Sequence, residues 1–176
     1  WEYVILRKEF LKKYPKPKNT TPNILVSMGG TDEKNMTEFV INSMKQINEK
    51  FKATIIVGSG YPYILQLKKR LEKVHFEFEL LQNPKDIAKI MSQSDFSIIS
   101  FGQTAYELAA LNVSALYICL TDDHFESSKL FMKNGAGTSL GIFSLMKQEG
   151  LAEAIKFHLS ENQVVKDMPI SANILN

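Results

Sequence analysis

The sequence has 176 residues, a length that fits one domain with an ordinary hydrophobic core. Its net charge is +2 and its basic residues are mostly scattered, so the charge pattern gives no indication of nucleic-acid binding. Cys119 is the only cysteine, which excludes an internal disulfide and favours a reducing, cytoplasmic location. No apolar run approaches the roughly 20 residues that a membrane-spanning helix needs.

The composition changes along the chain and divides it into three parts. Residues 1–22 are interpreted as a short extended or helical opening followed by a linker rich in Lys, Pro, Asn and Thr. Residues 23–160 carry the patterns of one α/β domain, and residues 161–176 form a tail without a strong period. Because the chain begins with Trp1 and not with Met, we interpret it as a piece of a longer polypeptide.

Two hydrophobic patterns, one typical of buried strands and one typical of amphipathic helices, alternate through residues 23–160. Short, nearly continuous apolar runs predict strands at residues 24–28, 53–57, 76–81, 95–100, 115–120 and 138–140. Apolar residues at spacings of three and four predict helices at residues 36–47, 64–74, 84–91, 103–111, 125–134 and 143–159. This alternation predicts a Rossmann-like parallel sheet of about six strands with helices on both faces. Ligands of such sheets bind at the carboxyl ends of the strands, so the loops after the strands are the places to inspect.

The loop after the first strand contains Gly29, Gly30, Thr31 and Asp32. Two glycines let the backbone approach a ligand closely, and the next helix offers free N–H groups and a positive dipole end. A diphosphate suits this place, although many ordinary strand-to-helix turns also use glycine, and Thr31 or Asp32 can cap the helix. The loop is neither a GxGxxG fingerprint nor a P-loop. No metal-ligand spacing such as HxxxH or CxxC occurs, and no cofactor is expected.

The loop after the fourth strand contains Gly102, Gln103 and Thr104, with Glu107 one turn further into the next helix. Gly102 permits close approach, and Gln103 and Thr104 offer polar groups at the helix start. A carboxylate at Glu107 can accept two hydrogen bonds from vicinal hydroxyls, as a ribose presents them. The alternative is an acid in the first helical turn that complements the helix dipole.

Two further loops carry polar residues. Asp122, Asp123 and His124 follow the fifth strand, where they can touch a sugar or its phosphates or simply cap the next helix. Gln82 and Asn83 follow the third strand and can present backbone groups to the edge of a base.

Together and in this order, the loops resemble those of the UDP-2,4-diacetamido-2,4,6-trideoxy-β-L-altropyranose hydrolases (PseG) of pseudaminic acid biosynthesis, over about residues 1–160. Residues 3–10 look like the segment before the second domain of these enzymes, residues 28–32 match their first glycine turn, and residues 102–107 resemble their Gly-Ser-Thr-Thr-Trp-Glu run. The chain departs from the family at residues 122–124, where Asp-Asn-Gln is usual, and at Phe101, where a small residue is usual. Both departures are expected beside the sugar. The resemblance extends more distantly to the MurG-type N-acetylglucosaminyltransferases.

The resemblance implies the carboxy-terminal half of a GT-B fold that binds a UDP-sugar. It implies the following binding residues: Gly29, Gly30, Thr31, Gly102, Gln103 and Thr104 at the diphosphate, Glu107 at the ribose, Gln82 and Asn83 at the uracil, and Asp122 and His124 near the sugar. The catalytic His of these hydrolases lies in an amino-terminal domain, which is the partner expected within the same polypeptide. The isolated chain is therefore expected to be inactive.

Three functions remain open from the sequence. The first is the UDP-sugar-binding domain of a nucleotide-sugar hydrolase in nonulosonic, pseudaminic acid-like surface polysaccharide biosynthesis. The second is the donor-binding domain of a GT-B glycosyltransferase, in which a sugar hydroxyl replaces the attacking water. The third is a non-catalytic sugar-nucleotide-binding module fused to a cytidylyltransferase.

Overall fold

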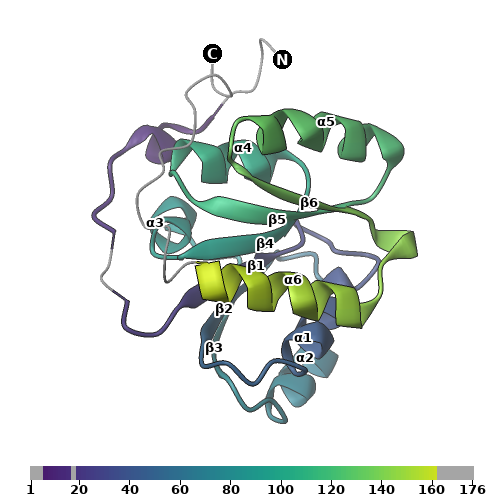
Figure 1. Ribbon diagram of the computed structural model, residues 1–176. Coiled ribbons are helices and arrows are strands. Elements are labelled where there is room, and N and C mark those ends of the chain that lie inside the picture. The colour runs from purple at the N-terminus through teal and green to yellow at the C-terminus, as the bar shows by residue number, and fades with distance from the viewer. Residues whose placement is uncertain (1–5, 17–18, 162–176) are drawn as a thin grey trace.

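A computed structural model describes residues 6–16 and 19–161 of the chain (Figure 1). Its centre is one six-stranded sheet in which every strand pair is parallel, in the order β3-β2-β1-β4-β5-β6. The strands are β1 Asn23–Ser27, β2 Lys52–Val57, β3 Glu77–Gln82, β4 Phe96–Ser100, β5 Ser114–Cys119 and β6 Gly137–Ile142. The predicted fold class is confirmed, because the sheet is parallel, six-stranded and covered by helices on both sides.

Helices cover both faces of the sheet (Figure 1). They are α1 Met36–Met44, α2 Ile64–Leu71, α3 Ile87–Ser92, α4 Gln103–Ala110, α5 Asp122–Lys133 and α6 Gln148–Glu161, with the 3-10 turns η1 Lys8–Leu11 and η2 Phe143–Leu145. Side chains of α1, α2 and α6 share one apolar core, and side chains of α3, α4, α5 and η1 share the other. None of the described helices has the length and apolar character that crossing a membrane requires.

The two cores explain why the strands read as continuous apolar runs. Ile24 and Val26 of β1 point into the core of α1, α2 and α6, whereas Leu25 between them points into the other core. All three are fully buried. A strand buried on both faces has no polar side to alternate with, which is typical of parallel sheets between helices.

Some predicted helix boundaries are wrong, and local hydrogen bonds and packing explain two of them. The fifth helix begins at Asp122 and not at Phe125, because the Thr121 hydroxyl accepts a hydrogen bond from the His124 backbone N–H at 3.2 Å and caps the first turn. The last predicted helix, residues 143–159, is split into η2 and α6. The Phe143 ring packs edge-on against Phe39 at 5.2 Å, and the backbone is extended at Met146.

The described part of the predicted linker lies against the domain. Phe10 is fully buried in the core of α3, α4 and α5. The Lys16 ammonium donates a hydrogen bond to the Asn112 carbonyl at 2.8 Å, and the Asn19 amide donates one to the Asp95 carboxylate at 3.0 Å. Residues 1–5 of the opening segment and residues 162–176 of the predicted tail lie outside the described residues.

Candidate functional site

Strands β1 and β4 are neighbours at the centre of the sheet, and the strand order reverses between them. The chain leaves β1 for α1 on one face and leaves β4 for α4 on the other. In sheets of this order, ligands bind at that reversal, outside the carboxyl ends of the strands. Since Ser27 pairs with Ile99, the loops that contain Gly29 and Gly102 start from adjacent points. The structure therefore brings these two predicted loops together.

The amino end of α4 is open. Gly102 occupies the cap position and no side chain caps this end, whereas Thr121 caps α5. A side-chain carbon added at Gly102 would meet nothing within 4 Å. The helix start at Gln103 and Thr104 therefore combines a positive dipole end with free space beside the backbone, which is the arrangement that anions occupy at helix amino termini.

The amino end of α1 is occupied by the protein itself. The Asp32 carboxylate accepts hydrogen bonds from the backbone N–H groups of Met36 and Thr37, both at 2.8 Å. Asp32 is buried, and burial raises the pKa of its carboxyl although these hydrogen bonds act to lower it. The expectation that α1 offers free N–H groups to a diphosphate is thus wrong at these two positions, while the predicted capping role of Asp32 is confirmed.

The turn that contains Gly29 and Gly30 is supported by a second glycine turn after β2. A side-chain carbon on Gly58 would lie 2.1 Å from the Gly30 carbonyl oxygen, so only glycine fits there without moving the backbone. Positions 29 and 30 themselves face open space. The sequence does not predict this contact of Gly58, because nothing in the local pattern shows which other loop lies against it.

Glu107 is a buried carboxylate on α4, the helix that begins after Gly102. It is the fifth residue of α4, and no acid lies in the first turn of this helix, so the first-turn alternative is wrong. Its Oε1 atom lies 3.3 Å from Nη2 of Arg7, whose Nη1 is 3.0 Å from Glu9. Burial raises the pKa of Glu107, and the charge and hydrogen bond of Arg7 lower it. Sequence reasoning missed Arg7 as a partner because 100 positions separate it from Glu107.

The loop after β5 lies next to the loop after β4. Asp122 and Asp123 are exposed in the first turn of α5, where negative charge complements the helix dipole. The His124 ring lies beside Phe101, with 6.1 Å between the ring centres. Its Nδ1 atom is buried and has no hydrogen-bond partner among the described residues.

Phe101 was expected beside the sugar, but its side chain points into the core. It is 5% exposed, and its ring packs edge-on against Tyr117 and Phe131, both with ring centres 5.3 Å apart. The large side chain therefore fills the space between α4, β5 and α5.

Gln82 and Asn83 lie further from the centre. Gln82 is the last residue of β3 and Asn83 follows it, two strands from β1, which corresponds to roughly 10 Å at the usual strand spacing. Both are exposed, and Asn83 adopts a left-handed backbone with φ of 48° while its N–H bonds to the Val57 carbonyl at 2.9 Å. The chain then enters α3, which packs against α4. Helix α3 is thus the element that links this loop to α4.

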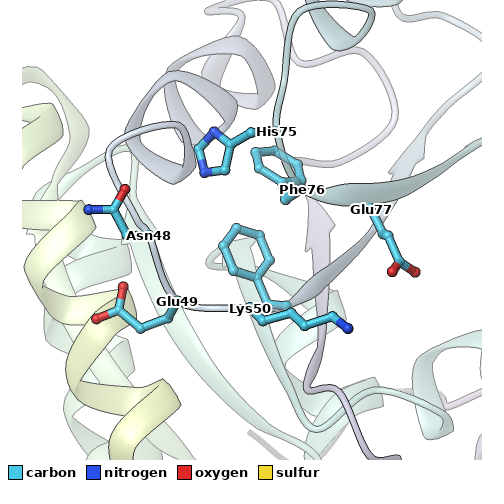
Figure 2. Close-up of a pocket in the computed structure, with 7 residues that line it drawn as sticks. Asn48, Glu49, Lys50, His75, Phe76 and Glu77 are labelled. Atoms are coloured by element: carbon cyan, nitrogen blue, oxygen red, sulfur yellow. The ribbon is translucent and has the colours of Figure 1, made fainter.

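Two cavities lie at the opposite, amino-terminal end of the strands. One of about 180 Å³ is shown in Figure 2. Its lining residues are Asn48, Glu49, Lys50, Phe51, His75, Phe76 and Glu77. A second cavity of about 400 Å³ shares Glu49 and Lys50 with it. Neither involves the predicted loops. Within the described ranges, no group of His, Cys, Asp and Glu side chains is arranged to hold a metal ion.

The sheet order and the glycine loops at its centre define a Rossmann-like domain of the kind found in GT-B glycosyltransferases. Its fold is similar to that of MurG from Acinetobacter baumannii, with a TM-score of 0.74 and 22% identity over 93% of this chain and 46% of that one. No protein-family model matches the sequence.

Sequence relatives confirm the predicted resemblance. The chain is 30% identical over 131 residues to the spore coat polysaccharide biosynthesis protein SpsG of Bacillus subtilis, covering 73% of this chain and 38% of SpsG. It is 24% identical over 135 residues to the UDP-2,4-diacetamido-2,4,6-trideoxy-β-L-altropyranose hydrolase of Campylobacter jejuni, covering 77% of this chain and 48% of the hydrolase. The chain thus spans less than half the length of each of these proteins.

Proposed function

We propose that this chain is the UDP-sugar-binding domain of a nucleotide-sugar hydrolase that acts in pseudaminic acid-like surface polysaccharide biosynthesis. The observation that carries the proposal is the open amino end of α4 at the centre of the sheet, with a buried carboxylate on the same helix. The names of the Campylobacter and Bacillus relatives, a UDP-sugar hydrolase and a polysaccharide biosynthesis protein, support the substrate class and the pathway.

In this proposal the domain holds the leaving group. Hydrolysis places negative charge on the departing UDP, and the backbone N–H groups of Gln103 and Thr104 can stabilise that charge without a metal. Glu107 accepts hydrogen bonds from the ribose hydroxyls, since Arg7 bonds only Oε1 and a carboxylate has about four acceptor positions. Gln82 and Asn83 then lie on the side where α3 meets α4, beside the uracil. Asp122 and His124 lie on the β5 side, near the sugar.

The Gly29–Gly30 turn has a smaller role in this proposal than the α4 end. Its backbone borders the diphosphate, together with Thr31, but Asp32 already uses two N–H groups of α1.

The same arrangement would serve the donor site of a glycosyltransferase, and the fold similarity to MurG favours that as the second candidate. Both candidates require UDP binding by this domain.

The chain should bind UDP more tightly than CMP, GMP or NAD. A UDP site of this form recognises a diphosphate at α4, a ribose at Glu107 and a pyrimidine near α3, and each of the other nucleotides lacks or alters one of these groups. Calorimetric titration of the chain with each nucleotide measures the preference. Equal affinities, or no detectable binding of UDP, would contradict the proposal for both candidate enzymes.

Substitution of Gly102 by Ala should weaken UDP binding by about 1–3 kcal/mol, the usual cost of inserting a methyl group into an occupied space. The fold should lose less than about 1 kcal/mol, because the added carbon meets nothing within 4 Å in the free protein and only the helix cap is slightly poorer.

The matched control is Gly150→Ala in α6, outside the candidate site, where an added carbon also meets nothing within 4 Å. It should leave UDP binding unchanged, and the free energy of unfolding should rise by at most about 1 kcal/mol, since Ala favours a helix over Gly. Urea denaturation and UDP titration of both variants separate the two effects. If Gly102→Ala bound UDP like the unmodified chain, the diphosphate would lie elsewhere.

A further inference from the structure

Arg7 connects the amino-terminal segment to the candidate site. Its guanidinium lies between two carboxylates, 3.0 Å from Glu9 and 3.3 Å from Glu107, and 4.9 Å above the ring of Phe10. Phe10 is fully buried beneath it, so the position of Arg7 is fixed by packing as well as by charge. Its side chain is still 53% exposed, whereas that of Glu107 is 8% exposed.

A carboxyl group keeps all of its acceptor positions only while it is ionised. Burial favours the neutral form of Glu107, in which one oxygen carries a proton and acts as a donor, so fewer acceptor positions remain for the ribose hydroxyls. An adjacent guanidinium favours the ionised form and fixes the plane of the carboxylate by its hydrogen bond. The half-exposed guanidinium can do this at a small desolvation cost.

We propose that Arg7 is a positioning residue of the nucleotide site, which holds Glu107 ionised and oriented toward the ribose hydroxyls. The amino-terminal segment is then part of the binding site and not only a connection to it. This inference rests on the proposed function, because it assigns Arg7 a role in UDP binding through Glu107.

Several elements pack around α4 and differ in the charge that they carry. Helix α4 packs against η1, α3, β4 and β5, and its Tyr106 ring meets Phe131 of α5 with 4.8 Å between the ring centres. The charged and titratable side chains of α5 are Asp122, Asp123, His124, Glu126, Lys129 and Lys133. Helix α3 has one charged residue, Lys89, which is exposed, and β4 and β5 have none. The groups whose charge acts on Glu107 are Arg7, which lowers its pKa, and Glu9, which raises it. Tyr117 of β5 donates its hydroxyl to the Ala136 carbonyl.

The test is UDP titration of the 176-residue chain between about pH 5 and pH 8, with the variants Arg7→Met, Arg7→Lys and Lys8→Met. Arg7→Met should weaken UDP binding roughly 3- to 10-fold at neutral pH, between the effects of an exposed ion pair and of a buried charged hydrogen bond. Its affinity should also begin to fall at a higher pH on acidification, because the pKa of Glu107 rises when the guanidinium is removed. Arg7→Lys should restore most of the affinity. Lys8→Met removes an exposed charge from the same turn and should leave both the affinity and its pH dependence unchanged.

A double-mutant cycle distinguishes action through Glu107 from direct contact with the ligand. In a Glu107→Gln background, Arg7→Met should cause no further loss. A full additional loss there would overturn the proposal, since Arg7 would then bind the nucleotide itself. The proposal also fails if Arg7→Met has the same affinity and pH profile as Lys8→Met. Absence of UDP binding by the unmodified chain would instead refute the proposed function, which keeps the two failures apart.

Discussion

The 176-residue chain is expected to release no UDP from a UDP-sugar, with or without added magnesium. The domain proposed here holds the leaving group, but hydrolysis also needs a base that activates water, and general-base help alone contributes about 10²–10⁴-fold. The resemblance to the pseudaminic acid pathway hydrolases implies that this base belongs to the amino-terminal domain, whose closure also excludes bulk water.

The described histidines support this expectation. His75 bonds to the Ile47 carbonyl, and His158 packs on Phe96, so both lie at the amino-terminal end of the strands. His124 alone, of the three histidines in the sequence, lies beside the candidate site. Its backbone N–H donates a hydrogen bond to the Thr121 hydroxyl that caps α5, and its ring rests on Phe101.

The measurement is a UDP-release assay with UDP-2,4-diacetamido-2,4,6-trideoxy-β-L-altropyranose and UDP-N-acetylglucosamine, run on the unmodified chain and on His124→Ala. Both proteins should give the uncatalysed rate. Turnover by the unmodified chain that disappears in His124→Ala would place the base in this domain. The roles assigned from the resemblance would then be wrong.

Substitution of Glu107 by Gln should weaken UDP binding by about 1–3 kcal/mol, the usual value for hydrogen bonds to a charged group. Gln keeps the volume of the side chain but carries no charge, so the ribose hydroxyls lose an ionised acceptor. The same substitution should not destabilise the fold at neutral pH, because burial disfavours the ionised form of the native residue.

The pH dependence of stability checks this argument. Because the pKa of Glu107 is raised in the folded state, the native protein binds this proton more tightly than the unfolded chain does. The contribution of Glu107 to the free energy of unfolding therefore increases as the pH falls through the raised pKa, and decreases as the pH rises again. Urea denaturation of Glu107→Gln should lack this contribution. A large loss of stability with unchanged UDP affinity would show that Glu107 serves the fold alone.

The fold was predictable because it depends on local patterns. Each strand buried on both faces, such as β1 with Ile24, Leu25 and Val26, reads as an unbroken apolar run, and each helix carries apolar residues at helical spacing. The rule that parallel sheets bind ligands at the carboxyl ends of their strands then identified the loops of Gly29 and Gly102 as candidates.

The contacts within the site were less predictable, because they join residues that are distant in the sequence. Nothing near Asp32 shows that its carboxylate, and not a ligand, occupies the start of α1. The inward direction of Phe101 depends on Tyr117 and Phe131, and the role of Gly58 depends on the Gly30 carbonyl. Such pairings follow from tertiary packing, for which a single sequence has no periodic signal.

Strand β3 forms one edge of the sheet and has a strand partner on one side only. Phe78 is 42% exposed there, between the exposed acids Glu77 and Glu79. An open edge with an aromatic residue is a template for strand pairing between molecules. Two copies that paired along β3 would bring their carboxylates together, and like charges on facing strands repel. The glutamates on either side of Phe78 thus disfavour strand pairing between molecules along this edge.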